Sequence, residues 1–347
     1  MEDHKNIIQL LEQIPQPGFL VCDDQITNVN QAAAAMMLAP GQNFSEIHDM
    51  DPEDYQDPQN SQLCLTLTIN GRCHGAVVTR MDRFGLVLLD EPGAQEEFRS
   101  MALASMELRT PLMQAITAAR QMDPAGDGAA ARINQSLMQM LRLVGNMSDI
   151  SRYAASSRME LRDVDAFLLE LFEKARTITG SRARITFEGM QQPVFSLIDP
   201  EQLERAVWNI LSNSLKFLPE DGIITARLTR KGNMLRLTVT DNGSGIPENI
   251  RAGLFSRYLR QPGIEDSRFG FGLGLAIVRT AAANHGGTVL IGSGKESGTS
   301  VTMTLAIRQS DDSILRSPVF RPDYTCGWDH GLVELADCLD AELYSKV

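Results

Sequence analysis

The sequence predicts an α+β chain of several domains. Its 347 residues exceed the size of one ordinary core, and its apolar fraction of 43% is normal for a globular protein. Alternating apolar and polar residues, typical of strands, recur near both ends of the chain. The stretch between them repeats apolar residues with the period of a helix. These observations predict two mixed α/β domains separated by a helical one.

Composition limits the partners and the compartment. The net charge of −12 disfavours a nucleic-acid or anionic-membrane surface as partner. No continuous apolar window of about 18 residues occurs, so we expect no membrane-spanning helix, and the N-terminus lacks a signal-peptide pattern. Five cysteines without a CxxC spacing indicate free thiols rather than a disulfide framework or a zinc site. We therefore expect a cytoplasmic protein.

Residues 5–90 have the pattern of a small α+β domain. A short helix precedes two strands about an Asp-rich turn, and Asn30 is placed to cap a helix that runs to Met37. Three further strands follow, with the hairpin pair Asn70-Gly71 between the first two. This order, with ITNVNQAA at the strand-to-helix junction, resembles a PAS domain. The resemblance implies a sensing or dimerising module.

Residues 94–157 predict two long helices joined by the turn DPAGDG. The second helix repeats apolar residues from Ile133 to Met147, and Pro111 is expected to kink the first. Such a hairpin has an apolar face to bury, so we expect a homodimer or heterodimer through a four-helix bundle.

Residues 160–307 predict a mixed α/β domain. One helix begins at Asp199-Pro200, and another is ended by Gly286-Gly287. Strands occupy the rest of the domain, two of them forming a hairpin over residues 231–233. Residues 308–347 predict a linker and one short helix over GLVELADCLDAELY. That tail is equally compatible with packing on its own domain or on a partner.

The stretch from Asp241 to Ile277 carries the clearest functional pattern. Asp241 ends an alternating strand, and two glycine clusters, Gly243/Gly245 and Gly270/Gly272/Gly274, flank a polar loop. Glycine lets a backbone approach a ligand closely, and the N-terminus of the following helix favours phosphate. The pattern predicts a nucleotide site.

Four motifs in sequence order make this prediction specific. They are NILSNSLKF (209–217), DNGSGI (241–246), LFSRYLR (254–260) and GFGLGL (270–275). They resemble the N, G1, F and G2 boxes of sensor histidine kinases, and the resemblance covers residues 95–307. It implies a GHKL-type α/β sandwich that binds ATP. A P-loop is excluded because no GxxxxGK[ST] occurs.

The resemblance also implies roles for single residues. Asn209, Asn213 and Lys216 share one helical face at i, i+4 and i+7. An amide oxygen there can bind Mg²⁺, and a lysine can bind phosphate. By resemblance Asn213 holds Mg²⁺, Asp241 accepts a hydrogen bond from the adenine amino group, and Arg260 reaches phosphate. The predicted ATP-binding residues are Asn209, Asn213, Lys216, Asp241, Gly243, Gly245, Arg260, Gly270, Gly272 and Gly274.

One motif departs from the family pattern. Residues 105–112, SMELRTPL, resemble the H box, but Met106 stands where the family has the phospho-accepting histidine. A thioether has no nitrogen nucleophile, so autophosphorylation should fail. Glu107 and Thr110 are the remaining catalytic candidates, as a proton acceptor and as a residue that positions water on a partner's phospho-aspartate. Both are equally compatible with polar groups on the bundle surface.

The resemblance leaves several functions open. The chain can be a nucleotide-dependent switch on a response regulator, its phosphatase, or a heterodimer partner of a subunit that carries the histidine. A GHKL protein serine kinase is an alternative from within the superfamily, although an H-box-like hairpin argues against it. The alternative from another class is a non-catalytic nucleotide-binding scaffold.

Overall fold

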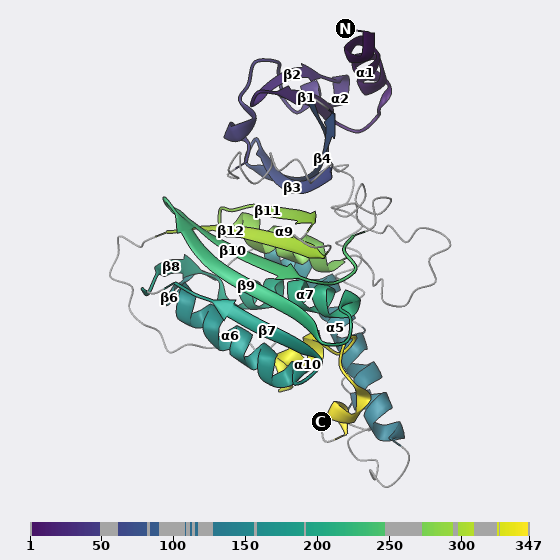
Figure 1. Ribbon diagram of the computed structural model, residues 1–347, viewed down its shortest axis with the longest axis vertical. Coiled ribbons are helices and arrows are strands. Elements are labelled where there is room, and N and C mark those ends of the chain that lie inside the picture. Colours follow the sequence, from purple (N-terminus) through teal and green to yellow (C-terminus); the bar gives the residue numbers. More distant parts are fainter. Residues whose placement is uncertain are drawn as a thin grey trace.

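The computed structural model describes residues 2–48, 62–81, 84–89, 108, 112, 115–116, 128–155, 158–190, 192–246, 273–293, 298–308, 325 and 327–345. Within these residues one ten-stranded sheet runs through the molecule in the order β2-β1-β5-β4-β3-β11-β12-β10-β9-β7. The N-terminal strands lie in the upper half and the helices of the C-terminal half cover one face of the sheet below (Figure 1). A second, two-stranded sheet pairs β6 with β8.

The N-terminal half contains the predicted helix, strand pair, helix and three strands. Asp23 and Asp24 (φ 47° and 64°) and Asn70 and Gly71 (φ 52° and 72°) have left-handed backbones, which confirms both tight turns. The elements are α1 (Glu2–Gln13), β1 (Gly18–Cys22), β2 (Gln25–Val29), α2 (Gln31–Ala35), the 3-10 turn η1 (Phe44–Glu46), β3 (Gln62–Ile69), β4 (Arg72–Met81) and β5 (Phe84–Leu89).

Asn30 caps α2 as predicted, but the helix is shorter than expected. The Asn30 Oδ1 atom accepts a hydrogen bond from the Ala33 amide at 2.9 Å. It also accepts one from the Gly18 amide at 3.0 Å, so the cap ties α2 to β1. The prediction that the helix reaches Met37 is wrong: α2 ends at Ala35, because Met37 takes a left-handed φ of 63° that an α-helix cannot continue.

The second helix of the predicted hairpin is α5 (Ala129–Ala155). Most of the first helix lies outside the described residues, as does Pro111. Of its described positions, Leu112 and Ile116 are buried in the main core, while Leu108 is exposed.

The C-terminal half packs its helices on the sheet through one apolar core. Asp199 caps α7 by accepting from the Gln202 amide at 3.2 Å, and Pro200 is its first residue, both as predicted. Trp208 of α7 is fully buried at the centre. The elements are β6 (Glu160–Asp163), α6 (Val164–Thr179), β7 (Ala183–Glu188), β8 (Phe195–Ile198), α7 (Pro200–Phe217), β9 (Gly222–Lys231), β10 (Met234–Asp241), α9 (Leu273–Asn284), β11 (Val289–Ser293) and β12 (Thr299–Ala306).

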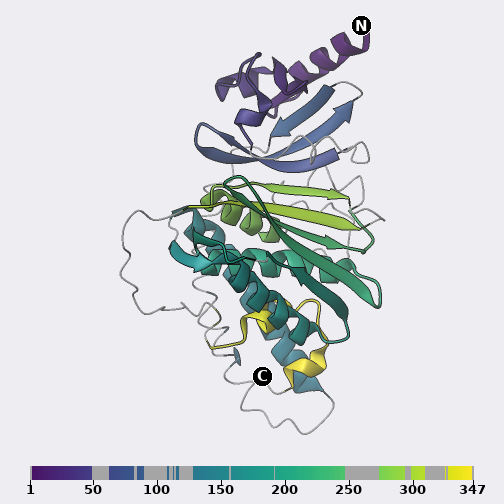
Figure 2. The same cartoon turned by 60° about the vertical axis from the view of Figure 1, so that its left-hand side comes forward.

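The two halves meet strand to strand. β3 pairs with β11 in antiparallel register, with Leu65 opposite Leu290 and Cys64 opposite Ile291 (Figure 2). Leu290 belongs to the N-terminal core cluster, although its strand belongs to the C-terminal half. The main-chain pairing and this shared side chain connect the two cores.

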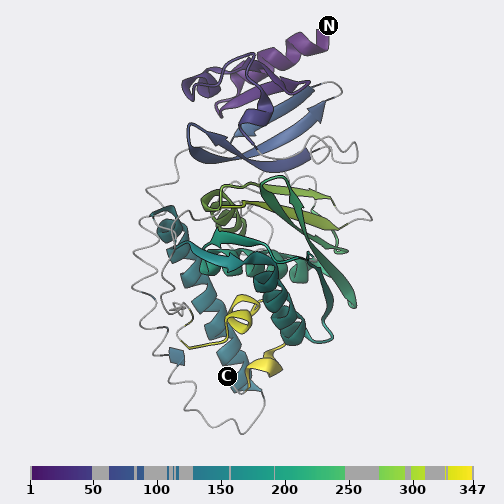
Figure 3. The same ribbon diagram turned by 90° about the vertical axis from the view of Figure 1, so that its left-hand side faces the viewer.

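The C-terminal tail differs from its prediction. Instead of one helix, it forms α10 (His330–Glu334), a turn and the 3-10 helix η3 (Ala341–Tyr344). The chain folds back because Tyr344 is fully buried and its hydroxyl donates to the Leu332 carbonyl at 2.8 Å, a contact that a straight helix cannot make. The tail packs on its own chain, beside α5 (Figure 3).

Among the described residues, no helix combines the length and apolarity needed to cross a bilayer.

Candidate functional site

The predicted nucleotide residues that the structure describes converge where α7, the end of β10 and the start of α9 meet. Asn209, Asn213 and Lys216 lie on α7, and Asp241 is the last residue of β10. Gly243 and Gly245 follow that strand, and Gly274 lies in the first turn of α9. The remaining predicted site residues lie outside the described residues; these are Arg260, Gly270 and Gly272, with Met106, Glu107 and Thr110 of the H-box-like motif.

Hydrogen bonds from three directions hold the Asp241 carboxylate, which is 7% exposed. Oδ2 accepts from the Ser214 hydroxyl at 2.8 Å. Oδ1 accepts from the Gly243 and Thr299 amides, each at 3.0 Å. A carboxylate has about four acceptor positions, so Oδ2 retains capacity for one more donor. Ser214 and Thr299 are partners that the sequence patterns did not indicate.

Glycine is required where the backbone segments approach each other. A Cβ on Gly274 would lie 2.8 Å from Asn209 Oδ1, and one on Gly243 would lie 2.8 Å from the Phe217 carbonyl oxygen. Gly245 has a φ of 71°, a conformation that other residues adopt only under strain. The glycines therefore bring the start of α9 and the turn after β10 against α7.

The polar atoms of Asn209 are already engaged within the protein. Asn209 is 1% exposed, and its Nδ2 donates to the Arg205 carbonyl at 2.9 Å. Its Oδ1 accepts from Arg142 Nη2 of α5 at 3.4 Å. Asn213, one turn further along α7, is half-buried.

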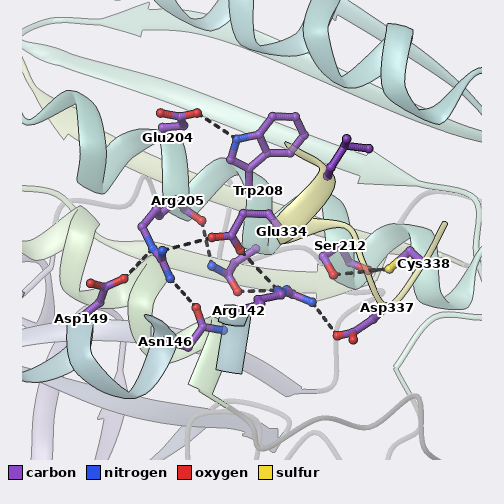
Figure 4. Close-up of polar contacts among 12 residues, drawn as sticks. Arg142, Asn146, Asp149, Glu204, Arg205, Trp208, Ser212, Glu334, Asp337 and Cys338 are labelled. Atoms are coloured by element: carbon purple, nitrogen blue, oxygen red, sulfur yellow. Dashed lines mark hydrogen bonds and ion pairs between the residues drawn. The ribbon is translucent and has the colours of Figure 1, made fainter. Parts of the chain in front are cut away.

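A network of six charges, buried at Asp149, Arg205, Glu334 and Arg142, links α5, α7 and the tail; Figure 4 labels all of them except Lys216. Arg205 contacts Asp149 at 2.6 Å and Glu334 at 3.2 Å. Arg142 contacts Glu334 at 3.3 Å and Asp337 at 2.7 Å. Asp337 also lies 3.2 Å from Lys216 Nζ. Positive and negative groups alternate along this chain of contacts, so the network carries no net charge.

Sequence reasoning missed this network because its members are far apart in the chain. Arg142 lies nine residues after Ile133, about two and a half helical turns, so the helical period places it on the side opposite the predicted apolar stripe. A charge on that side is ordinarily solvent-exposed, so the pattern gave no sign that Arg142 has a buried partner.

His285, at the end of α9, supports the start of α7. Its Nε2 accepts from the Asp199 amide at 2.9 Å, and its Nδ1 lies 2.7 Å from the Ala281 carbonyl oxygen. These contacts require the neutral ring with the proton on Nδ1. Burial lowers the pKa of His285, and its exposure is 1%. The geometry assigns this histidine a structural role.

Within the described ranges, no group of three or more His, Cys, Asp or Glu side chains is placed to hold a metal ion. Asn213, half-buried on α7, carries an amide oxygen, and Mg²⁺ takes such oxygens together with phosphate and water oxygens.

Comparison with known proteins finds a family match over the part of the chain that carries these residues. Residues 198–309 match the family described as "Histidine kinase-, DNA gyrase B-, and HSP90-like ATPase". The chain is 27% identical over 325 residues to the sensor-like histidine kinase SenX3 of Mycobacterium tuberculosis, covering 88% of this chain and 76% of SenX3. This chain is a homologue of sensor histidine kinases.

Two further relatives set the extent of the likeness. The histidine protein kinase DivJ of Caulobacter vibrioides is 32% identical to this chain over 223 residues. The alignment covers 60% of this chain and 37% of DivJ. The structure of full-length ShkA in complex with AMPPNP aligns with 23% identity and a TM-score of 0.50, covering 61% of this chain and 46% of ShkA. The second comparison concerns the fold alone.

Replacing Glu334 by Gln should destabilise the protein. The change leaves Arg142 and Arg205 without their shared buried carboxylate, and breaking a buried ion pair from one side costs about 3–5 kcal/mol. We expect a lower urea midpoint for Glu334→Gln and a change below about 0.5 kcal/mol for the exposed Glu342→Gln control. Equal midpoints for all three proteins would contradict this role of Glu334.

Stability should decrease as the pH falls below the ordinary pKa of histidine. Burial lowers the pKa of folded His285, so the unfolded chain binds the proton more readily. The stabilisation is complete above about pH 6.5 and is lost toward the lower folded pKa, by at most about 1.4 kcal/mol per pH unit. Urea unfolding between about pH 7.5 and 5 should show a steeper loss for the native chain than for His285→Gln. Parallel stability profiles of the native chain and His285→Gln against pH would show that His285 does not cause the loss of stability.

Proposed function

We propose that this histidine kinase homologue binds Mg-ATP between α7, the end of β10 and the start of α9. The observation that carries the proposal is the Asp241 carboxylate, which is held in place by Ser214, Gly243 and Thr299 while Oδ2 retains acceptor capacity. A carboxylate held in this way is suited to accept a hydrogen bond from the adenine amino group.

The phosphates would lie toward α7 and the start of α9. Asn213 is half-buried on α7 and would supply an amide oxygen to Mg²⁺, which neutralises phosphate charge when it is bound. Lys216 would supply a positive charge one turn further along. Gly274 brings the N-terminus of α9 against Asn209, and helix N-termini favour phosphate. Gly243 and Gly245 would leave room for the adenine base. Arg260, Gly270 and Gly272 would complete the part of the site that binds the phosphates.

We further propose that the protein acts in two-component signalling without phosphorylating itself. Met106 cannot form a phosphoramidate, so a bound γ-phosphate has no acceptor at the usual position. Glu107 would serve as a proton acceptor, and Glu107-x-x-Thr110 would position water on the phospho-aspartate of a response regulator. A partner subunit that carries the histidine would be the alternative phosphate acceptor.

The proposed domain organisation follows the sequence prediction: a PAS-like sensor in residues 5–90, a dimerising hairpin in 94–157, an ATP-binding domain in 160–307 and a tail in 308–347. The strand order β2-β1-β5-β4-β3 supports the sensor, because the first two strands and the last three form one antiparallel sheet beside α2. The exposed side chains of Ile133 and Met140 on α5 support an unpartnered hairpin face.

Nucleotide binding should depend on Asp241 and Asn213. Asp241→Asn replaces the charged acceptor proposed for the adenine amino group, and Asn213→Ala removes the proposed Mg²⁺ ligand, so we expect affinity for Mg-AMPPNP to fall by about tenfold or more. Isothermal titration calorimetry measures the effect, with Asn233→Ala in the exposed β9–β10 turn as the matched control. Equal affinity in the native chain and both site variants would place the nucleotide elsewhere. A native chain that binds no nucleotide would favour a scaffold protein whose nucleotide site no longer works.

Met106 should prevent autophosphorylation. Incubation of the native chain with radiolabelled ATP should leave no acid-labile phosphate on the protein, whereas Met106→His restores the missing nucleophile. Phosphohistidine on the native chain would contradict the proposal. Phosphoserine on a co-purified protein would instead support the serine-kinase alternative.

A further inference from the structure

The C-terminal segment 327–345 is held in two ways: its main chain is bound to α5, and its apolar side chains pack in the main core. On the α5 side, Gln135 Nε2 donates to the Ala336 and Leu339 carbonyls at 3.0 and 2.6 Å. Gln139 Nε2 donates to the Ala336 carbonyl at 3.2 Å. These contacts hold the main chain of the tail against α5, independently of its side chains.

The apolar side of the same segment belongs to the main core. Gly331 packs so closely that an added Cβ would lie 2.3 Å from Ile178 Cδ1 and 2.9 Å from the Trp208 ring. The side chains that share this burial are Trp328, Val333, Leu335, Leu339 and Tyr344. The segment is thus docked in a fitted position on its own chain.

The charged side of the tail faces the residues proposed to bind phosphate. Asp337 places a carboxylate oxygen 3.2 Å from Lys216 Nζ. The same oxygen lies 2.7 Å from Arg142 Nη1, and Arg142 in turn donates to Asn209. Lys216 and Asn209 are therefore engaged, directly or through Arg142, by a carboxylate where the proposed function places a phosphate.

We propose that the docked tail is an autoinhibitory contact, in which Asp337 occupies the phosphate-binding charges and Mg-nucleotide binding releases the tail. This inference rests on the proposed function. Because coupling between two binding events is reciprocal, loosening the tail tightens nucleotide binding, and nucleotide loosens the tail. Release also removes the links that Glu334 and Asp337 make between α5 and α7 and leaves the direct pairs Arg205–Asp149 and Arg142–Asn209, so nucleotide occupancy would change how the hairpin is held.

Two variants of the 347-residue chain weaken docking of the tail from opposite sides. Asp337→Asn removes the carboxylate at Lys216, and Gln135→Ala removes hydrogen bonds to the tail without contacting α7. Both should tighten the binding of Mg-AMPPNP, measured by calorimetry, on the order of tenfold. Asp340→Asn is the matched control, because Asp340 is an exposed tail carboxylate that makes no side-chain capping hydrogen bond. Circular dichroism checks that each variant is folded.

Cys338 reports on the tail directly. Its thiol is 3.5 Å from the Ser212 hydroxyl and donates to the Ser212 carbonyl at 3.4 Å, and burial raises its pKa. Docking should therefore slow its reaction with N-ethylmaleimide. Mass spectrometry of the Cys338 peptide should show faster labelling with Mg-AMPPNP in the native chain, and faster labelling without nucleotide in both variants.

Each alternative outcome is distinct. Unchanged nucleotide affinity in both variants would overturn the inference while leaving the proposed function intact. Tighter binding in Asp337→Asn alone would also overturn it, because that result reflects local charge at Lys216 rather than docking. Cys338 labelling that does not respond to bound nucleotide would do the same. Absence of nucleotide binding in every protein would overturn the proposed function itself, and the inference with it.

Discussion

The arrangement of the C-terminal half depends on Glu334, one buried carboxylate shared by two arginines. Arg142 comes from α5 and Arg205 from α7, and Glu334 reaches both from the tail. Each of the three side chains is at most 6% exposed, so none of these charges is stabilised by water. A buried charge without its partner costs several kcal/mol. The three segments consequently have to dock together, and this requirement sets where the tail lies.

The same network of charges extends to the residues that are proposed to bind nucleotide. Outward from Glu334, the alternating charges end at Lys216, on the α7 face that carries the predicted N box. Asp337 supplies the negative charge at Lys216, where the proposed function places a phosphate. Through Glu334 and Asp337 the tail contacts both α5 and α7, so under the proposed autoinhibition the docking of the tail and the occupancy of the proposed phosphate-binding face are parts of one equilibrium.

The sheet supplies a second connection, at the opposite end of the molecule. Pairing of β3 with β11 joins the N-terminal strands to the strands that carry Asp241, and Leu290 shares the N-terminal core. A displacement in the N-terminal half would have to be accommodated across these hydrogen-bonded strands. The residues proposed to bind nucleotide therefore lie between two contacts, one through the sheet and one through the tail.

The sequence by itself determined the local structure around the candidate site. Turn residues such as Asn70-Gly71, the caps Asn30 and Asp199, and the alternation leading to Asp241 act through neighbours in the chain, so their outcome was predictable. Tertiary structure alone decided the path of the tail and the partners of Arg142, because a buried charge finds its counter-charge through space. No periodicity in the sequence encodes a pairing across more than a hundred residues.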